Sequence, residues 1–383
     1  MASIVQPSIA CQPYRSWVEV SLGSIAANYR AIRDLVGANV EVMPVVKADA
    51  YRHGAVAVSR TLAAEGVRWL AVSNAEEGIV LREAGLQTRI LVMADFLPFS
   101  REATLAHGLT PVIHSLADLT ELDRLGAQRG QRVKYHLKID SGMGRLGVRP
   151  DAGIAEAVIT AKNAELEGLM THFASAANYD SGQTDEQMAT FGRVLENLAA
   201  AKISPSLVHL SSTIPIAYGR RGAWRDMVRP GHAIYGYLSP SRGHAPGKVL
   251  KVEPALTWRT TVLSVKDVPA GSKIGYGGMF TTERPSRIAV LAVGYADGLP
   301  HRLSNRGHAI VKQKLAPILG SVSMDLTTID VTDCPAVQPG DAVTLLGSEG
   351  DVRIGAQEIA RLAGTISYSV LCGIHARVKR VYI

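Results

Sequence analysis

From about residue 40 to residue 237, short apolar runs alternate with longer amphipathic stretches, and this alternation limits the fold more than any other feature. The amphipathic stretches have helical spacing, as in residues 74–85, 115–128 and 185–201. The short runs are rich in β-branched residues, which is typical of buried parallel strands. The expected strands cover residues 41–48, 69–73, 89–94, 110–115, 132–140, 166–173, 206–212 and 227–237. Eight strands alternating with helices predict an α/β fold, an eight-stranded parallel (β/α) barrel rather than an open sheet.

After about residue 247 the pattern changes, because short strands follow one another between Gly and Pro turns. This predicts a mostly antiparallel β-domain, interrupted by one helix at 355–364. A strand and a helix within residues 16–36 precede the barrel's first strand. We therefore expect a barrel domain at 14–247 and a β-domain at 248–383, on which residues 1–13 could also pack.

Composition and charge exclude several classes of protein. The net charge is +7, but the 41 Lys and Arg residues are scattered, which argues against nucleic-acid binding. No apolar stretch reaches the ~20 residues of a membrane helix, and the N-terminus lacks the pattern of a signal peptide. The three cysteines, Cys11, Cys334 and Cys372, are too widely spaced for a disulfide framework or a metal pattern. We expect a cytoplasmic protein with no membrane or nucleic-acid partner and no metal.

Lys47 closes the first strand run, and functional residues of parallel barrels lie at the C-terminal ends of strands. A buried ammonium group is costly unless it is paired or made neutral. A neutral lysine can form a Schiff base with a carbonyl compound. The alternative is a rim lysine that pairs with Asp49.

Two further strand ends have the chemistry of a phosphate site. The seventh run ends in residues 211–213 (Ser-Ser-Thr), and the eighth ends in residues 229–232 (Arg-Pro-Gly-His). Loops after strands seven and eight are the usual phosphate seat of barrels. Hydroxyl groups, and a glycine that lets backbone N–H groups approach, suit that anion. Ordinary turn chemistry is the alternative.

The ends of strands five and six complete the set of candidate residues. The glycine-rich turn 140–147 presents Arg145, but it is not a G-x-G-x-x-G sequence, which argues against a dinucleotide-binding fold. The sixth run ends in Thr171 and His172, and an isolated histidine is often only a core residue. A strand-end lysine and a phosphate seat on one rim indicate pyridoxal phosphate, whose aldehyde would take the lysine and whose phosphate would take the loops.

Several long motifs, in order from about Trp17 to the end of the chain, resemble bacterial alanine racemases. The motifs are VVKADAYRHG, HLKIDSGMGRLG, EGLMTHFASA, VRPGHAIYGYLSP, KIGYGGMF with its continuation to LSNRG, PILGSVSMDLTTIDVT and TISYSVLCGI. The resemblance implies a pyridoxal phosphate-dependent isomerase with an α/β barrel, a β-domain and a homodimer with shared active sites. Its implied reaction interconverts L-alanine and D-alanine by a two-base mechanism and supplies D-alanine for peptidoglycan.

The resemblance also implies a role for each matching residue. Lys47 would be the Schiff-base lysine, and Tyr276, supplied by the other subunit, the second base. His172 and Arg229 would stand behind that tyrosine, and Arg229 would also face the pyridine nitrogen. Lys138 matches a lysine that is often carbamylated and that holds Arg145. The other implied contacts are Tyr51, Ser212, Thr213, Gly231, His232 and Tyr368 for the cofactor, Arg145 and Met324 for the substrate carboxylate, and Tyr295 at the entrance.

Several positions depart from the family's pattern, among them Ser323 in place of a cysteine and Ala177 near a usual acidic residue. Ser212 and Thr213 replace an Asn-Ser pair, Arg52 replaces a glycine, His232 an aliphatic residue and His301 an arginine. These changes lie at the cofactor's edge and at the entrance, whereas the catalytic residues are intact. We therefore expect racemisation, with the substrate range and the rate left open.

Three alternatives differ in their requirements. A serine, lysine or broad-specificity racemase of the same fold would need more room than Tyr368 leaves beside a methyl-sized side chain. A decarboxylase of basic amino acids would lack Tyr276 and Arg229 in this arrangement. A non-enzymatic pyridoxal phosphate carrier would be a barrel without the second domain.

Overall fold

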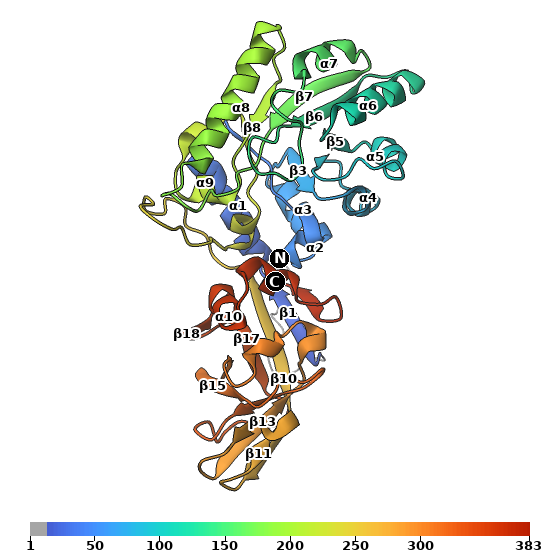
Figure 1. Ribbon diagram of the computed structural model, residues 1–383. Coiled ribbons are helices and arrows are strands. Elements are labelled where there is room, and N and C mark those ends of the chain that lie inside the picture. The colour runs from blue at the N-terminus through green and yellow to red at the C-terminus, as the bar shows by residue number, and fades with distance from the viewer. Residues whose placement is uncertain (1–13) are drawn as a thin grey trace, which may run out of the picture. The chain divides into compact units, whose positions relative to one another are not determined.

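The computed structural model describes residues 14–383, which form two units (Figure 1). One unit is Leu22–Pro254, and the other joins the segment that ends at Ser21 to Ala255–Ile383. The expected boundaries, 14–247 and 248–383, differ from these units at both ends of the barrel. Residues 14–21 belong with the β-strands of the second unit, and the barrel unit continues to Pro254. The expected packing of residues 1–13 lies outside the described residues.

The first unit is a parallel α/β barrel, as predicted. Its strands are β2 (Glu41–Val42), β3 (Trp69–Val72), β4 (Arg89–Val92), β5 (Thr110–Ile113), β6 (Val133–Lys138), β7 (Ala164–Met170), β8 (Leu207–His209) and β9 (Met227–Val228). Strands β3 to β8 form one parallel sheet, and β2 pairs in parallel with β9. The ring closes because Val46 N–H donates to the Ala71 carbonyl at 2.8 Å, and Arg229 N–H donates to the Ser211 carbonyl at 2.9 Å. The predicted eight-stranded barrel is thus confirmed.

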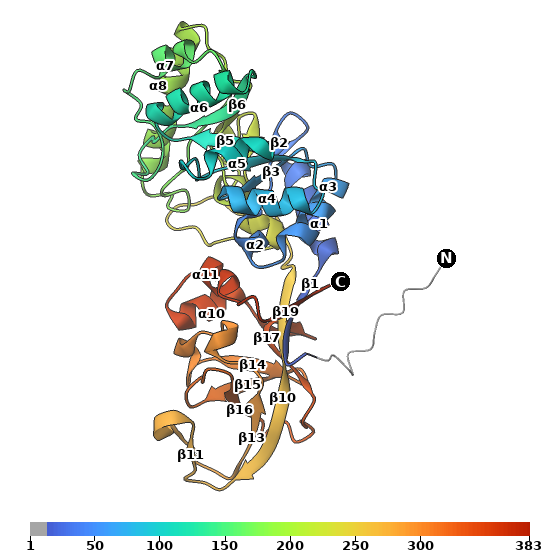
Figure 2. The same ribbon diagram turned by 90° about the vertical axis from the view of Figure 1, so that its right-hand side faces the viewer.

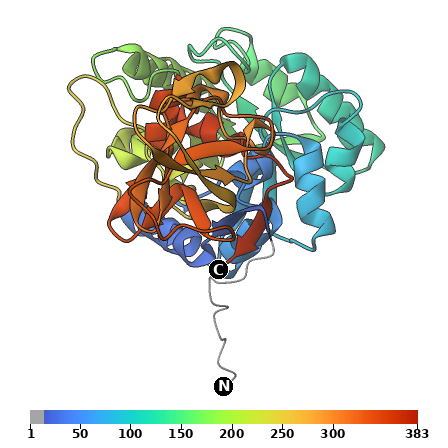
Figure 3. The same cartoon turned by 90° about the horizontal axis from the view of Figure 1, so that it is seen from below.

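Helices surround this barrel, and the blue, teal and green helices lie at its periphery in Figure 3. The expected helices at 74–85, 115–128 and 185–201 are confirmed as α4, α6 and α8. The helices of this unit are α1 (Leu22–Val36), α2 (Lys47–Tyr51), α3 (Ala55–Ala64), α4 (Ala75–Glu83), α5 (Arg101–Ala106), α6 (Leu116–Gln128), α7 (Ile154–Thr160), α8 (Gln183–Ala200) and α9 (Thr213–Ala217). Leu122, Leu137, Leu169 and Phe191 belong to a buried core cluster between helices and sheet, each at 1% exposure or less. Burial of such side chains contributes about 1.5–3 kcal/mol each.

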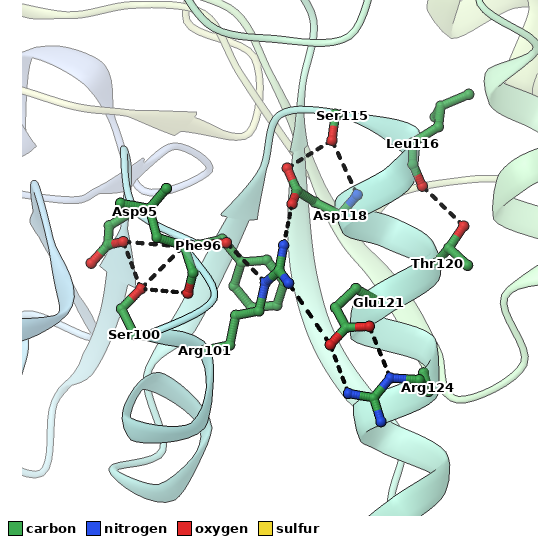
Figure 4. A network of polar contacts seen from close by, with 11 residues as sticks. Asp95, Phe96, Ser100, Arg101, Ser115, Leu116, Asp118, Thr120, Glu121 and Arg124 are labelled. Atoms are coloured by element: carbon green, nitrogen blue, oxygen red, sulfur yellow. Dashed lines mark hydrogen bonds and ion pairs between the residues drawn. The ribbon is translucent and has the colours of Figure 1, made fainter.

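A polar network fixes the loop between β4 and α5 against α6 (Figure 4). The Ser115 hydroxyl caps α6 by accepting the Asp118 N–H at 3.0 Å. The Arg101 guanidinium donates to the Asp118 carboxylate at 2.7 Å and to the Phe96 carbonyl at 3.0 Å. Each interaction satisfies a polar group at a helix start, so the strand-to-helix turn keeps one conformation.

The second unit is a mostly antiparallel β-domain, which confirms the predicted change of pattern. Its main sheet has the order β18-β17-β14-β15-β16-β13-β10-β1-β19. The strands are β1 (Ser16–Val20), β10 (Leu256–Val268), β13 (Ser286–Leu291), β14 (His308–Val311), β15 (Lys314–Leu319), β16 (Thr327–Asp330), β17 (Ala342–Glu349), β18 (Val352–Ile354) and β19 (Lys379–Tyr382). Strand β1 lies between β10 and β19, as Figure 2 shows, and is antiparallel to β10 and parallel to β19.

Shorter elements complete this unit. A small hairpin joins β11 (Lys273–Ile274) to β12 (Phe280–Thr281). The predicted helix at 355–364 is confirmed as α10 (Ala356–Ala363), whereas α11 (Ser367–Cys372) was not predicted. No helix within residues 14–383 combines the length and apolarity needed to cross a lipid bilayer.

Candidate active site

The C-terminal ends of the barrel strands carry the residues that sequence analysis selected on this unit. Lys138 is the last residue of β6, His172 follows β7, and Arg229 follows β9 directly. Lys47 begins α2, and Thr213 begins α9. The strand-end rule therefore brings five candidate side chains to one rim of the barrel.

Lys47 opens a left-handed helical turn. All five residues from Ala48 to Arg52 have φ between 52° and 67°, although none of them is glycine. A left-handed conformation costs an ordinary residue roughly 1–2 kcal/mol. Such strain persists only where neighbouring contacts enforce it, and it gathers at functional sites. Arg52, which the resemblance in sequence places at a glycine position, adopts φ 67° and ψ 18°, a conformation that glycine adopts at less cost.

Two carboxylates hold this turn in place. Glu77 accepts the N–H of Ala48 at 2.6 Å and the N–H of Ser73 at 2.7 Å. Asp49 accepts the N–H of Ala55, the first residue of α3, at 2.7 Å. Asp49 therefore caps a helix, and within residues 14–383 we find no ion pair between it and Lys47. The pairing of Lys47 with Asp49 that the alternative requires is therefore not observed among these residues.

Thr213, Gly231 and Tyr51 form a compact polar cluster after strands β8 and β9. The Thr213 hydroxyl accepts the N–H of Gly231 at 3.2 Å and the N–H of Ala233 at 3.3 Å. Because it is the acceptor in both contacts, its own O–H remains a donor. A Cβ atom added at Gly231 would overlap the Tyr51 hydroxyl, so only glycine leaves this space open. Ser212 lies beside the cluster, half-buried, and its side chain makes no capping hydrogen bond.

Arg229 is buried at 2% exposure, and four acceptors lie within 3.1 Å of its guanidinium nitrogens. One terminal nitrogen donates to the Nδ1 atom and to the carbonyl of His209, both at 2.8 Å. The other donates to the Thr171 carbonyl at 2.7 Å and to the Leu210 carbonyl at 3.1 Å. Burial lowers the pKa of Arg229 to about 9, so the guanidinium stays charged at neutral pH. A fixed positive charge therefore lies beneath the rim.

Two rim histidines are neutral at physiological pH. Burial, together with the positive charge of Arg229, lowers the pKa of His172 to about 3. The second guanidinium nitrogen of Arg229 lies 3.5 Å from Nδ1 of His172, so Nδ1 faces a donor and Nε2 carries the ring proton. Burial, with His53 nearby, lowers the pKa of His232 to about 3. Its ring stacks with those of Tyr51 and Tyr237, at centroid distances of 6.3 Å and 5.3 Å.

Lys138 is buried at 5% exposure among other cations. Burial lowers its pKa to about 8, and the neighbouring charges of Arg145, Arg229 and Lys47 act in the same direction. An amine with such a pKa is partly neutral at neutral pH. The rim therefore concentrates positive charge, which favours an anionic ligand.

We expect Lys138→Met to raise the free energy of unfolding at pH 7 by about 3 kcal/mol in buffer free of carbon dioxide. The lysine pKa falls from 10.5 to about 8 on folding, and each unit corresponds to about 1.4 kcal/mol. Below pH 8 the wild-type lysine therefore lowers the free energy of unfolding by its full amount. This loss of stability disappears as the pH rises from 8 to 10.5, because the amine then becomes neutral in the unfolded state as well as in the folded state. Urea unfolding of both proteins at pH 7 and pH 10.5 measures the change. A difference that is the same at both pH values would contradict the prediction.

The remaining candidates lie on the β-domain. Tyr276, in a short 3-10 turn (Tyr276–Gly278), is 76% exposed. Tyr295 and Met324 are 42% and 54% exposed, and their loops are joined because Tyr295 N–H donates to the Ser323 carbonyl at 2.9 Å. Tyr368 lies on α11, half-buried. His301, whose position is commonly arginine in the family, lies 3.1 Å from the Ser321 hydroxyl and 6.2 Å, ring to ring, from Tyr295.

Sequence analysis missed three residues that contact this site or extend from it: half-buried Glu77 and the buried His209 and His136. Glu77 lies in the first turn of α4, where acidic residues are common, so nothing in the sequence marks it as a site residue. His209 and His136 lie within strand runs, where a polar residue among apolar ones is a usable signal.

An α/β barrel with a cationic, strained rim, followed by an antiparallel β-domain, defines a two-domain barrel enzyme. The family model of the alanine racemase N-terminal domain matches residues 20–239, and that of the C-terminal domain matches residues 255–382. The chain is 43% identical to the alanine racemase of Halothermothrix orenii over 369 residues, which is 96% of each protein. The chain therefore belongs to the alanine racemase family of isomerases, which confirms the resemblance in sequence.

Solved structures show the same likeness. The alanine racemase of Bacillus anthracis with bound L-Ala-P has 35% sequence identity and a TM-score of 0.89, over 97% of this chain and 96% of that chain. The alanine racemase of Bartonella henselae with covalently bound pyridoxal phosphate has 28% identity and a TM-score of 0.85, over 97% of this chain and all of that chain.

Proposed function

We propose that this protein interconverts L-alanine and D-alanine with pyridoxal phosphate as its cofactor. The observation that carries the proposal is the barrel rim, where buried Arg229 and Lys138 lie near Lys47 beside a glycine-containing polar cluster. This arrangement occurs in a chain of the alanine racemase family, and a related structure holds covalently bound pyridoxal phosphate. The broader assignment as an isomerase follows from the family itself.

The rim residues fit this cofactor. The Thr213 hydroxyl, the open space at Gly231 and the Tyr51 hydroxyl suit a phosphate group, since they offer donors around a place that a Cβ atom would fill. His232 would contribute its backbone N–H group, Ser212 would lie at the cofactor's edge, and Tyr368 would reach the phosphate. Lys47 would hold the aldehyde carbon through Nζ, and Arg229 would face the pyridine nitrogen.

When bound, the cofactor withdraws electrons from the α-carbon of the amino acid attached to it. Arg229 has no acceptor and stays charged, so it would leave a facing ring nitrogen unprotonated. An unprotonated ring nitrogen would withdraw electrons less strongly, which would favour return of the proton over transfer of the amino group. The buried guanidinium therefore suits a racemase.

Racemisation requires one proton to leave from one face of the α-carbon and another to arrive on the opposite face. We assign Lys47 to one face and the partner subunit's Tyr276 to the other. His172 supports this assignment, because its Nε2–H can donate to a phenolate oxygen while Nδ1 faces Arg229. Arg145, itself held by Lys138 or by its carbamate, and Met324 would contact the substrate carboxylate.

A homodimer explains the position of Tyr276. A tyrosine that is 76% exposed within its own chain has the exposure expected of a residue that enters a neighbouring subunit. Tyr295 and Met324 are exposed on the same unit and would line the entrance to that site. We place the enzyme in the cytoplasm, where its product would serve peptidoglycan synthesis, and Cys334 and Cys372 are both free thiols.

A substrate panel tests this function directly. Purified protein with pyridoxal phosphate is incubated with L-alanine, L-serine or L-lysine, and the products are separated on a chiral column. We expect D-alanine as the main product, because Tyr368 leaves room for a methyl group. Faster turnover of serine or of several amino acids would favour the alternative, a broad-specificity racemase, whereas no product from any of them would reject both.

We expect Thr213→Val to weaken the binding of pyridoxal phosphate by roughly 10- to 100-fold. Valine keeps the shape of threonine but removes a hydroxyl donor, and a hydrogen bond to a charged group is worth roughly 1.5–3 kcal/mol. Titration of the cofactor into apo-protein measures the dissociation constant. Thr213→Ser, which keeps the hydroxyl, is the matched control and should bind almost as wild type does. An unchanged constant for Thr213→Val would remove the residue from the phosphate site.

A further inference from the structure

A chain of buried polar side chains leads from Arg229 through the interior of the barrel. A guanidinium nitrogen of Arg229 lies 2.8 Å from Nδ1 of His209, and Nε2 of His209 lies 2.8 Å from Nδ1 of His136. Nε2 of His136 in turn lies 3.7 Å from Oε2 of Glu167. Both histidines are completely buried, and Glu167 is 6% exposed. The chain thus connects the cationic rim to a carboxylate on β7.

The direction of the two hydrogen bonds that link Arg229, His209 and His136 follows from the chemistry of arginine. A guanidinium can only donate, so Nδ1 of His209 must accept and its proton must be on Nε2. That Nε2–H then donates to Nδ1 of His136, whose own proton is therefore on Nε2. This Nε2 lies 3.7 Å from the Glu167 carboxylate, which is close enough for charge attraction but too far for a direct hydrogen bond. Burial lowers the pKa of both rings, which keeps them neutral. Two neutral imidazoles of one tautomer thus separate a cation from an anion.

Glu167 is anchored as a charged group. Arg89 donates to its two oxygens at 2.8 Å and 2.6 Å, and Lys134 donates at 3.3 Å. The Arg89 guanidinium also lies 3.8 Å from the ring centre of Trp69. Although burial opposes ionisation, the nearby His136 ring and the hydrogen bonds and charge of Arg89 hold the pKa of Glu167 well below its usual range.

The backbone leaves a place for the His136 ring. His136 lies opposite Gly168 in the register of β6 and β7. A Cβ atom at residue 168 would overlap the ring at Nδ1, the atom that accepts from His209. Glycine at this position therefore allows the central link of the chain.

We propose that His136 and Glu167 are positioning residues, which act through His209 to fix the orientation and the charge of Arg229. A carboxylate near one nitrogen of a buried imidazole polarises the ring and makes the other nitrogen a better acceptor, so the charge of Glu167 strengthens the two hydrogen bonds between His136 and Arg229. The inference rests on the proposed function, in which Arg229 faces the pyridine nitrogen. A guanidinium held in this way would keep a facing ring nitrogen unprotonated and would disfavour transfer of the amino group.

Nitrogen NMR of the full-length, histidine-labelled protein tests the chain without any activity measurement. We expect His209 and His136 to carry a proton on Nε2 alone from pH 6 to pH 9. Glu167→Gln should shift the ring signals of both histidines, whereas Glu165→Gln should shift neither. Glu165 is a matched control, since it lies on the same strand and 3.8 Å from the same Lys134. A proton on Nδ1 of either ring, or a His209 signal that ignores Glu167→Gln, would overturn the proposal.

Kinetics of the cofactor-loaded enzyme supply a second readout. Glu167→Gln should lower kcat for alanine by about 5- to 10-fold while KM changes less than about twofold, because a charge-assisted bond is roughly twice as strong as a neutral one. The ratio of pyruvate formed to alanine racemised should rise by a similar factor, and Glu165→Gln should change neither value. An unchanged ratio would mean that Glu167 supports only the fold. If the wild type fails to racemise alanine, the proposed function fails, and the wild-type tautomers still decide whether the chain exists.

Discussion

Lys47→Ala is expected to abolish racemisation in both directions and to remove the yellow colour of the lysine-bound cofactor. One side chain serves as both the anchor of the aldehyde and the base on one face, so neither function survives its removal. Alanine is compatible with the local backbone, because Ala48 and Ala50 already form the left-handed turn that follows. The absorption spectrum and chiral assays started from each enantiomer measure the two losses separately.

Lys162→Ala is a suitable control for this prediction. Lys162 is an exposed lysine of the same barrel, whose Nζ donates to the Ile159 carbonyl at 2.8 Å. This variant should keep both the colour and the wild-type turnover. If Lys47→Ala also kept them, Lys47 would be a rim residue without a catalytic role, and the proposed function would lose its anchor.

The barrel could be predicted from the sequence because its hydrophobic periodicity is local. Each apolar run and each amphipathic stretch can be recognised within about 15 residues. The position of β1 could not be predicted in this way, because its partners, β10 and β19, are more than 230 residues away in the chain. The sequence therefore predicts that β1, which directly precedes a helix of the barrel, belongs to the barrel, whereas its backbone pairs with strands of the β-domain.

The rim residues could also be predicted, since functional groups of barrels follow the strand ends. The left-handed turn after Lys47 could not, because no residue from Ala48 to Arg52 is glycine. Its conformation depends on tertiary contacts with Glu77 and on the Asp49 cap of α3. Similarly, His136 and His209 belong to different strands, and only the curvature of the sheet brings Nδ1 of His136 to 2.8 Å from Nε2 of His209.

Tyr276→Phe is expected to reduce proton exchange on one face of alanine by about 10²–10⁴, the usual contribution of a positioned general base. Phenylalanine keeps the ring and removes only the hydroxyl, so the exposed turn at Tyr276–Gly278 has no reason to refold. Deuterium wash-in from heavy water, followed separately for L-alanine and D-alanine, measures exchange on each face. Tyr382→Phe changes a tyrosine that is 43% exposed on β19 and is the matched control. Small, equal losses for both enantiomers would exclude Tyr276 as a base.

Mixing the two inactive variants decides whether Tyr276 acts on its own chain or on a partner. Lys47 belongs to the barrel unit and Tyr276 to the β-domain. If each site combines Lys47 of one subunit with Tyr276 of the other, a heterodimer of Lys47→Ala and Tyr276→Phe chains contains one site with both residues intact. Activity should therefore return after subunit exchange, to about half that of an equal amount of wild-type dimer for each heterodimer formed. Heterodimers seen by native mass spectrometry without any activity would show that both residues serve a site within one chain.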